Sequence, residues 1–360
     1  MLCCAAFAVT SCLLATPKSS VRVAAASSAV PELTVVIVTL DGVRWQEVFE
    51  GVDAKLAATH GLTPAEVVRA EDLMPNLHAI VATHGAALGA PGHGAAISAS
   101  GPDFVSLPGY AELFSGRRAT ECKNNGCARS GARTVVDELA DVSQGPGAPV
   151  AVFTSWPEIE RVAVEHPRGA AISSGRHGGA TRDVFSTDPA LSPILLRAEN
   201  VAPWPGGGDF RPDSLTAELA LRHLRAHAPK FLFVGLGEPD EYGHHDDYAG
   251  YLNALRASDA RIGELDRELQ RLATEGRRTV LFVTADHGRA DSFKDHGWEY
   301  PESSRVWLVA AGSAIRPAGM VSAPTERRLA DLAPTVRAIA GLPPDTDSNA
   351  GNTLAELLAL

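Results

Sequence analysis

Continuous apolar runs alternate along the chain with segments that carry a helical pattern of hydrophobic and polar residues. The runs are LTVVIVTL (33–40), PVAVFTSW (149–156), KFLFVGLG (230–237), RTVLFVT (278–284) and RVWLVAAG (305–312). None of them alternates between apolar and polar positions, which is typical of strands buried on both faces of a mostly parallel sheet. We therefore expect each run to form a buried strand.

The segments between the runs predict helices that cover such a sheet. The clearest spans 248–275, where Leu and Ile recur at steps of three, four and seven and charged residues occupy the other face. Similar patterns lie at 74–85, 213–228 and 326–342. Strands that alternate with helices predict an α/β fold with a doubly wound, mostly parallel sheet flanked by helices. A stretch rich in Gly and Pro at 165–211 interrupts the alternation, and we expect an irregular insertion there.

The first thirty residues differ from the rest and predict an export leader. MLCCAAFAVTSCLLA is short and apolar, and VRVAAASSA resembles the cleavage region of a secretory signal, although a basic start is missing. The tripeptide VTS before Cys12 is similar to a lipobox, so a lipid anchor at Cys12 is an alternative, and a misassigned start codon is another. Neither this stretch nor any later one is long enough to predict a transmembrane helix. We expect an exported protein, periplasmic, secreted or lipid-anchored, with a single domain over 31–360.

Composition and charge exclude some classes of function. Hydrophobic residues make up 45% of the chain and charged residues 21%, as in a globular protein. The formal net charge of −11 argues against a nucleic-acid scaffold as partner, because binding to phosphate backbones relies on clustered Lys and Arg. A small anionic substrate remains compatible with this charge if local cations recruit it. In an exported chain, Cys122 and Cys127 favour a small disulfide loop over a metal site.

Three predicted strands are each followed closely by an aspartate. Asp41 follows the first run, Asp240 the third and Asp286 the fourth. Ligands of open α/β sheets bind beyond the carboxyl ends of the strands, so we expect the three carboxylates to meet at one edge. A single Asp there would be a turn or cap residue, but three like charges in one place call for a compensating cation.

Three histidines accompany these aspartates and favour a transition metal. His244 follows Asp240 by four residues, His287 is adjacent to Asp286, and His296 comes nine residues later. Mixed imidazole and carboxylate ligands suit zinc, with manganese or iron as alternatives, whereas nitrogen donors disfavour calcium.

Ser106, in VSLPGYAELFSG, is a candidate nucleophile at the start of a predicted helix. A Ser before x-Pro is commonly a helix N-cap. The same place also directs a hydroxyl toward the positive end of a helix, where phosphoryl groups bind. The local sequence leaves both interpretations open.

These residues lie in a series of short motifs that resembles, in order, the motifs of the alkaline phosphatase superfamily. The motifs are VTLDGVR with Asp41, MPNL (74–77), SLPGYAELFSG with Ser106, EPDEYGH (238–244), TADHG (284–288), DHG (295–297) and DLAPTV (331–336). The chain is most similar to the branch of nucleotide pyrophosphatases/phosphodiesterases and their small exported bacterial relatives. The motifs span nearly all of the chain after the leader, and the combination of PDxxGH, TADHG and a later His is the specific part.

The resemblance implies a two-metal phosphohydrolase. It assigns one divalent metal to Asp240, His244 and His296, and a second to Asp41, Ser106, Asp286 and His287. The expected reaction cleaves phosphodiester, pyrophosphate or phosphomonoester bonds through a phosphoseryl intermediate on Ser106, because paired divalent metals activate a hydroxyl and stabilise the leaving oxygen. The expected partner is a small anionic phosphoester.

The diesterase branch also uses an asparagine downstream of the nucleophile to contact a phosphoryl oxygen. Asn125, or its neighbour Asn124, stands near that place, and a turn residue is the alternative. Lys123, Arg44 and Arg176 could approach a substrate anion, but surface solvation is the simpler interpretation of each.

Departures from other branches narrow the implied function. Sulfatases and phosphonate monoester hydrolases carry an Arg four residues after the nucleophile position, where this chain has Tyr110. The phosphoglycerate mutases carry a second domain after the nucleophile, for which this chain has too few residues. The alternatives to a phosphohydrolase are a non-catalytic metal-binding protein on the same fold and a sulfatase-like hydrolase.

Overall fold

The computed structural model describes residues 1–2, 32–118, 120–143, 148–166, 169–179 and 181–359. Pro31–Leu360 form a compact unit. The leader expected at 1–30 lies outside the described residues from residue 3 onward, and Cys12 lies there too.

The compact unit is built on an eight-stranded sheet, with the strand order β10-β2-β9-β7-β1-β6-β4-β5. Its strands are β1 (Leu33–Leu40), β2 (Gly85–Leu88), β4 (Val150–Thr154), β5 (Ala171–Ser174), β6 (Phe231–Leu236), β7 (Arg278–Thr284), β9 (Leu308–Gly312) and β10 (Gly319–Met320). Neighbours are parallel except where β9 pairs with β7 and β2. A small second sheet contains β3 (Ile97–Ser98), β8 (Arg305–Val306) and β11 (Arg327–Arg328). The mostly parallel sheet predicted from the apolar runs is therefore present.

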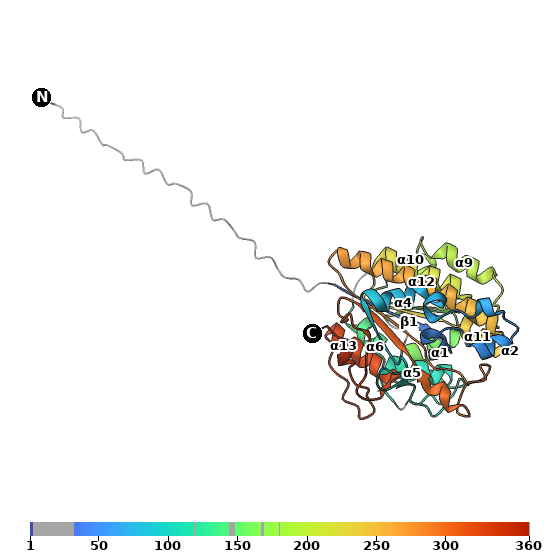
Figure 1. Ribbon diagram of the computed structural model, residues 1–360. Helices are drawn as coiled ribbons and strands as arrows, with labels where there is room; N and C mark the ends of the chain where they lie inside the picture. The colour runs from blue at the N-terminus through green and yellow to red at the C-terminus, as the bar shows by residue number, and fades with distance from the viewer. Residues whose placement is uncertain (3–31, 119, 144–147, 167–168, 180, 360) are drawn as a thin grey trace. The chain divides into compact units, whose positions relative to one another are not determined.

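Helices cover both faces of the sheet. In Figure 1, α4, α10 and α12 lie on one side of the strands, and α5, α6 and α13 lie on the other. The helices are α1 (Trp45–Phe49), α2 (Ala54–Thr59), α3 (Ala70–Leu73), α4 (Pro75–Thr83), α5 (Ser106–Ser115), α6 (Val135–Asp141), α7 (Glu160–Ala163), α8 (Arg182–Ser186), α9 (Ser192–Asn200), α10 (Asp213–His227), α11 (Glu238–His244), α12 (Tyr248–Thr274) and α13 (Leu332–Ala340). All eight residues of β1 are buried, as expected of a central strand with helices on each face.

The structure differs from the predicted elements in three places. The last apolar run is divided into β8 and β9, and β9 runs antiparallel to β7, a direction that burial on both faces does not encode. The strand β2, between β10 and β9, is GAAL, which lacks the β-branched residues that mark a strand. The segment 165–211, expected to be irregular, contains β5, which pairs with β4, together with α8 and α9.

In the part of the chain that the structure describes, every helix lacks the combination of length and apolar character that crossing a membrane requires.

Candidate metal centre and nucleophile

Strand register brings the three predicted aspartates to one edge of the sheet. Thr39 of β1 pairs with Thr284 of β7, so Asp41 and Asp286, each two residues further on, lie level with one another. Leu40 pairs with Leu236 of β6, after which α11 begins almost at once and carries Asp240. Gly42 (φ +63°) turns the chain after Asp41, and its N–H donates to Asp286 Oδ1 at 3.1 Å.

The first cluster consists of Asp240, His244 and His296. One ligand atom from each lies within 4.8 Å of the others. The spacing of four residues places Asp240 and His244 on the same face of α11, with His244 Nε2 2.9 Å from Asp240 Oδ2. His296, on the loop after β7, brings its Nε2 to 3.2 Å from His244 Nε2.

The second cluster consists of Asp41, Asp286 and His287, all buried, with ligand atoms within 4.8 Å of one another. His287 Nε2 lies 3.4 Å from Asp41 Oδ1 and 3.5 Å from Asp286 Oδ2. Asp286 Oδ2 is buried and accepts no hydrogen bond from the described residues. A buried carboxylate oxygen without a donor is costly, and coordination of a cation would satisfy it.

Two backbone carbonyls orient the cluster imidazoles. His287 Nδ1 lies 2.8 Å from Gly288 O, and His296 Nδ1 lies 3.0 Å from Phe104 O. A carbonyl only accepts hydrogen bonds, so each Nδ1 carries the proton and each Nε2 is left to face its cluster. The two rings stack with centroids 4.1 Å apart, which places the clusters side by side.

Without a bound cation, the electrostatics of the second cluster favour protonation of its members. Burial, together with the charge of Asp41, raises the pKa of Asp286 well above its usual range. Burial opposes protonation of His287, but Asp286 and the other carboxylates outweigh it and raise the pKa of His287 to about 10. A divalent cation bound here would displace those protons.

One permanent cation, the Arg289 guanidinium, pairs with Asp240 beside the first cluster. Burial opposes ionisation of Asp240, but the charges of Arg289, His296 and His244 hold the pKa of Asp240 well below its usual range. Arg289 lies just after the TADHG motif, where nothing in the sequence pattern marks it as part of the site. The converging Nε2 atoms and carboxylates of both clusters fit divalent metals that accept mixed nitrogen and oxygen ligands.

Ser106 faces the second cluster. It is the first residue of α5, where Val105 is the N-cap, and the cap position makes no side-chain hydrogen bond. Ser106 Oγ lies 3.3 Å from both Asp41 Oδ1 and His287 Nε2. The structure therefore places this hydroxyl at the cluster and does not use it as a helix cap.

Two residues of the first turns of α5 fix the position of Ser106. A Cβ on Gly109 would clash with the carbonyl oxygen of Asp286, so glycine allows α5 to approach the end of β7. Tyr110, which occupies the sulfatase Arg position, is fully buried and donates from its hydroxyl to Asp41 Oδ2 at 3.1 Å. Here the fourth residue after Ser106 supports a cluster carboxylate.

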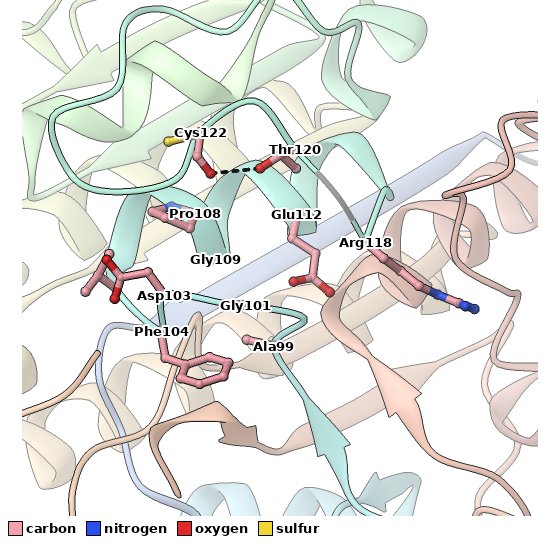
Figure 2. Close-up of a pocket in the computed structure, with 11 residues that line it drawn as sticks. Ala99, Gly101, Asp103, Phe104, Pro108, Gly109, Glu112, Arg118, Thr120 and Cys122 are labelled. Atoms are coloured by element: carbon pink, nitrogen blue, oxygen red, sulfur yellow. Dashed lines mark hydrogen bonds between the residues drawn. The ribbon is translucent and has the colours of Figure 1, made fainter. Parts of the chain in front are cut away.

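Glu112 anchors the same helix on the side shown in Figure 2. Its carboxylate accepts from the N–H and hydroxyl of Ser100, both at 2.7 Å, and from the N–H of Ala330 at 3.0 Å. Burial raises the pKa of Glu112 to about 7 despite these donors. The adjoining cavity has room for about 10 Å³, near the size of one water, so it is too small for a substrate.

Asn125 lies beside the start of α5, next to the candidate nucleophile Ser106, whereas Asn124 bonds within its own turn. Asn125 Oδ1 accepts from the backbone N–H of Leu107 at 2.9 Å, at the start of α5. Asn124 Oδ1 accepts from Gly126 N–H at 2.8 Å and closes a local turn. The predicted disulfide between Cys122 and Cys127 is present and closes the loop that carries both asparagines.

Two of the three remaining basic candidates, Arg44 and Arg176, are engaged in contacts of their own. Surface solvation is wrong for Arg44, which is buried and forms an ion pair with Glu47, with Nε 3.0 Å from Oε2. Arg176 donates to the carbonyls of Val201 and Gly208, both at 2.9 Å, and so fixes a loop. Lys123 is exposed.

Known proteins resemble parts of the chain in sequence. Residues 209–344 match the model of the Metalloenzyme superfamily, a segment that includes the first cluster, Asp286 and His287. A 2,3-bisphosphoglycerate-independent phosphoglycerate mutase of Thermomicrobium roseum is 29% identical over 142 residues, 38% of this chain and 26% of the mutase. A phosphopentomutase of Herpetosiphon aurantiacus is 33% identical over 133 residues, 36% of this chain and 31% of that protein. The match therefore spans about a quarter to a third of these relatives.

Solved structures resemble nearly the whole compact unit. The alkaline phosphatase PafA aligns with a TM-score of 0.59 and 11% identity, covering 92% of this chain and 100% of PafA. A phosphonate monoester hydrolase from Silicibacter pomeroyi aligns with a TM-score of 0.55 and 15% identity, covering 91% of this chain and 76% of the hydrolase. The α/β fold of this chain is thus similar to the folds of PafA and of the phosphonate monoester hydrolase, and residues 209–344 match the Metalloenzyme superfamily.

Proposed function

We propose that the protein is a metal-dependent phosphoester hydrolase in which Ser106 is the nucleophile. The observation that carries the proposal is the position of Ser106 Oγ, 3.3 Å from Asp41 Oδ1 and from His287 Nε2 in the second cluster. The first cluster lies beside it through the stacked rings of His287 and His296. In our proposal, each cluster holds one divalent metal, and zinc is the preferred candidate.

The proposed reaction proceeds in two displacements. Divalent cations at the clusters would lower the pKa of the serine hydroxyl and stabilise the charge that develops on the leaving oxygen. Ser106 Oγ gives up its proton as it attacks phosphorus, the bond to the leaving oxygen breaks, and the released alkoxide takes up a proton from solvent. Water then attacks the phosphoserine, which frees phosphate or a phosphomonoester and restores the Ser106 hydroxyl. Asp41 and His287 hold Oγ in place for both steps.

Within this class we propose a phosphodiesterase related to the nucleotide pyrophosphatase/phosphodiesterase branch. Tyr110 in place of the sulfatase arginine supports a direct serine nucleophile, and with it phosphoryl transfer over sulfuryl transfer. Asn125, beside the start of α5, supports the diesterase assignment. We also propose that the protein is exported, on the basis of its predicted leader.

The test is turnover of bis-p-nitrophenyl phosphate, p-nitrophenyl phosphate and p-nitrophenyl sulfate by the full chain loaded with zinc or manganese. We expect metal-dependent hydrolysis, fastest on the diester and absent on the sulfate. Faster hydrolysis of the monoester would reassign the enzyme as a phosphatase. No turnover by protein that retains two equivalents of metal would favour the non-catalytic alternative.

Replacement of Asn125 by Ala is expected to lower kcat/KM by about 100-fold, the usual cost of removing one donor to a developing phosphoryl charge. With Oδ1 bound to Leu107 N–H, the Asn125 NH₂ group makes no hydrogen bond among the described residues and is available to a substrate oxygen. Asn124→Ala is the matched control, because its side chain bonds only within its own turn. Equal kinetics for the two variants, with circular dichroism showing both folded, would remove Asn125 from the site.

A further inference from the structure

Arg289 links the first cluster to the loop that carries His296. It is buried, only 2% exposed, and its guanidinium spans three partners. Nη1 pairs with Asp240 Oδ1, Nε donates to Phe293 O at 2.6 Å, and Nη2 donates to Lys294 O. One side chain therefore touches a carboxylate of α11 and the backbone just before His296.

The loop held by Arg289 is closed on itself. Ala290 N–H donates to Asp295 O at 2.8 Å, and Phe293 N–H donates to Ala290 O at 2.8 Å. The Phe293 ring is buried edge-on against Tyr248 and Tyr251 of α12, with centroids 5.0 Å apart in both pairs. The aromatic contacts fix one end of the loop, and Arg289 fixes the end next to His296.

Two glycines make room for this guanidinium. A Cβ on Gly243, between Asp240 and His244 on α11, would clash with Arg289 Cζ. A Cβ on Gly42 would clash with Asp240 Oδ1 and lie 2.9 Å from Arg289 Nη1. Segments after β1, β6 and β7 are thus all shaped around the pair of Arg289 and Asp240.

We propose that Arg289 is a positioning residue that holds Asp240 and His296 in the geometry required by a divalent cation in the first cluster. Arg289 pairs with Asp240 Oδ1. Asp240 Oδ2, which lies 2.9 Å from His244 Nε2, then faces the cluster. Through the loop carbonyls it also sets where His296 Nε2 converges on His244. This inference rests on the proposed function only in that the first cluster must bind metal.

Coulomb repulsion by Arg289 and positioning by Arg289 have opposite effects on metal affinity, so an experiment can tell them apart. A guanidinium beside the cluster repels a cation, so if its charge were the dominant effect, removing it would tighten metal binding. If positioning dominates, removing it weakens binding, because Asp240 and the His296 loop lose the contact that orders them.

The test is metal binding by the full chain, stripped with a chelator and titrated with Zn²⁺ against a chromophoric competitor. For Arg289→Met we expect the affinity of one of two sites to fall by tenfold or more and the other to stay unchanged. Arg289→Lys keeps the charge but cannot reach all three partners at once, so we expect an intermediate loss. Arg337→Met is the matched control, since Arg337 is equally buried and pairs with Glu138 (Nε to Oε2, 2.7 Å).

A double-mutant comparison assigns the weakened site. His244→Ala removes a residue of the first cluster, and Arg289→Met added to it should cause no further loss of metal affinity if both act on that cluster. Unchanged or tighter metal binding by Arg289→Met would overturn the inference. If the Met variant does not fold, unchanged metal binding by Arg289→Lys would overturn it instead. Absence of metal binding by the unsubstituted protein would instead overturn the proposed function, and the positioning role with it.

Discussion

Ser106→Ala is expected to lower phosphoester turnover by about 10⁴-fold or more, the order of loss seen when a covalent nucleophile is removed. Alanine leaves Asp41, Asp286 and His287 in place, so the variant should still bind metal. The measurement is the hydrolysis rate of the preferred p-nitrophenyl substrate beside the metal content of the same sample. Loss of turnover with metal retained would separate a nucleophile from a structural residue.

Ser115→Ala is the control for that substitution. Ser115 lies at the other end of α5, is buried, and donates from Oγ to Ala111 O at 2.6 Å, remote from both clusters. It should keep near-normal turnover. Mass spectrometry of acid-quenched enzyme should find phosphate on the Ser106 peptide of the unsubstituted protein and of Ser115→Ala, and no phosphate on the corresponding peptide of Ser106→Ala. Normal turnover by Ser106→Ala would assign the nucleophile to another group, such as water.

Removal of metal is expected to abolish turnover and to lower the midpoint of thermal unfolding by several degrees. A ligand present at about 1,000 times its Kd stabilises a fold by about 4 kcal/mol, and each cluster would lose that contribution. Treatment with EDTA followed by restored zinc should reverse both changes, as followed by activity and by scanning fluorimetry. Turnover that survives complete metal removal, verified by elemental analysis, would contradict the metal-dependent mechanism.

The thermal difference between loaded and metal-free protein should widen as the pH rises. In the metal-free protein the pKa of His287 is raised from 6.5 to about 10, so the stability from its protonation is fully present below pH 6.5 and is lost as the pH approaches 10. The raised pKa of Asp286 acts with the same sign. Bound metal replaces these protons, so the loaded protein should not share the decline. Parallel melting curves across this range would show that the second cluster does not bind metal.

The sequence predicts those parts of the fold and site that depend on short segments. β1, β6 and β7 are continuous apolar runs, and parallel pairing then places Asp41, Asp240 and Asp286 at one edge. The ends of these strands and the segments that directly follow them are enough to group the aspartates with the three histidines. Spacing along the chain therefore carries most of the information on the two clusters.

Contacts between distant segments were not predictable from pattern. Arg44 is buried because its partner Glu47 also accepts from Tyr248, two hundred positions away on α12. The role of Arg289 depends on a space left by Gly42 and Gly243, which no local signal reveals. The direction of β9 depends on which strand it joins, and a fully buried run has the same composition in either direction.

The two clusters differ in how they meet solvent. The side chains of Asp41, Asp286 and His287 are at most 4% exposed, whereas the His244 side chain of the first cluster is 49% exposed. A cation in the second cluster could leave only after the enclosing side chains moved apart, whereas one in the first cluster would exchange through an open side. The ion in the second cluster would then exchange slowly and stay bound. The ion in the first cluster would exchange quickly, so its occupancy and identity would follow the metals available around the protein.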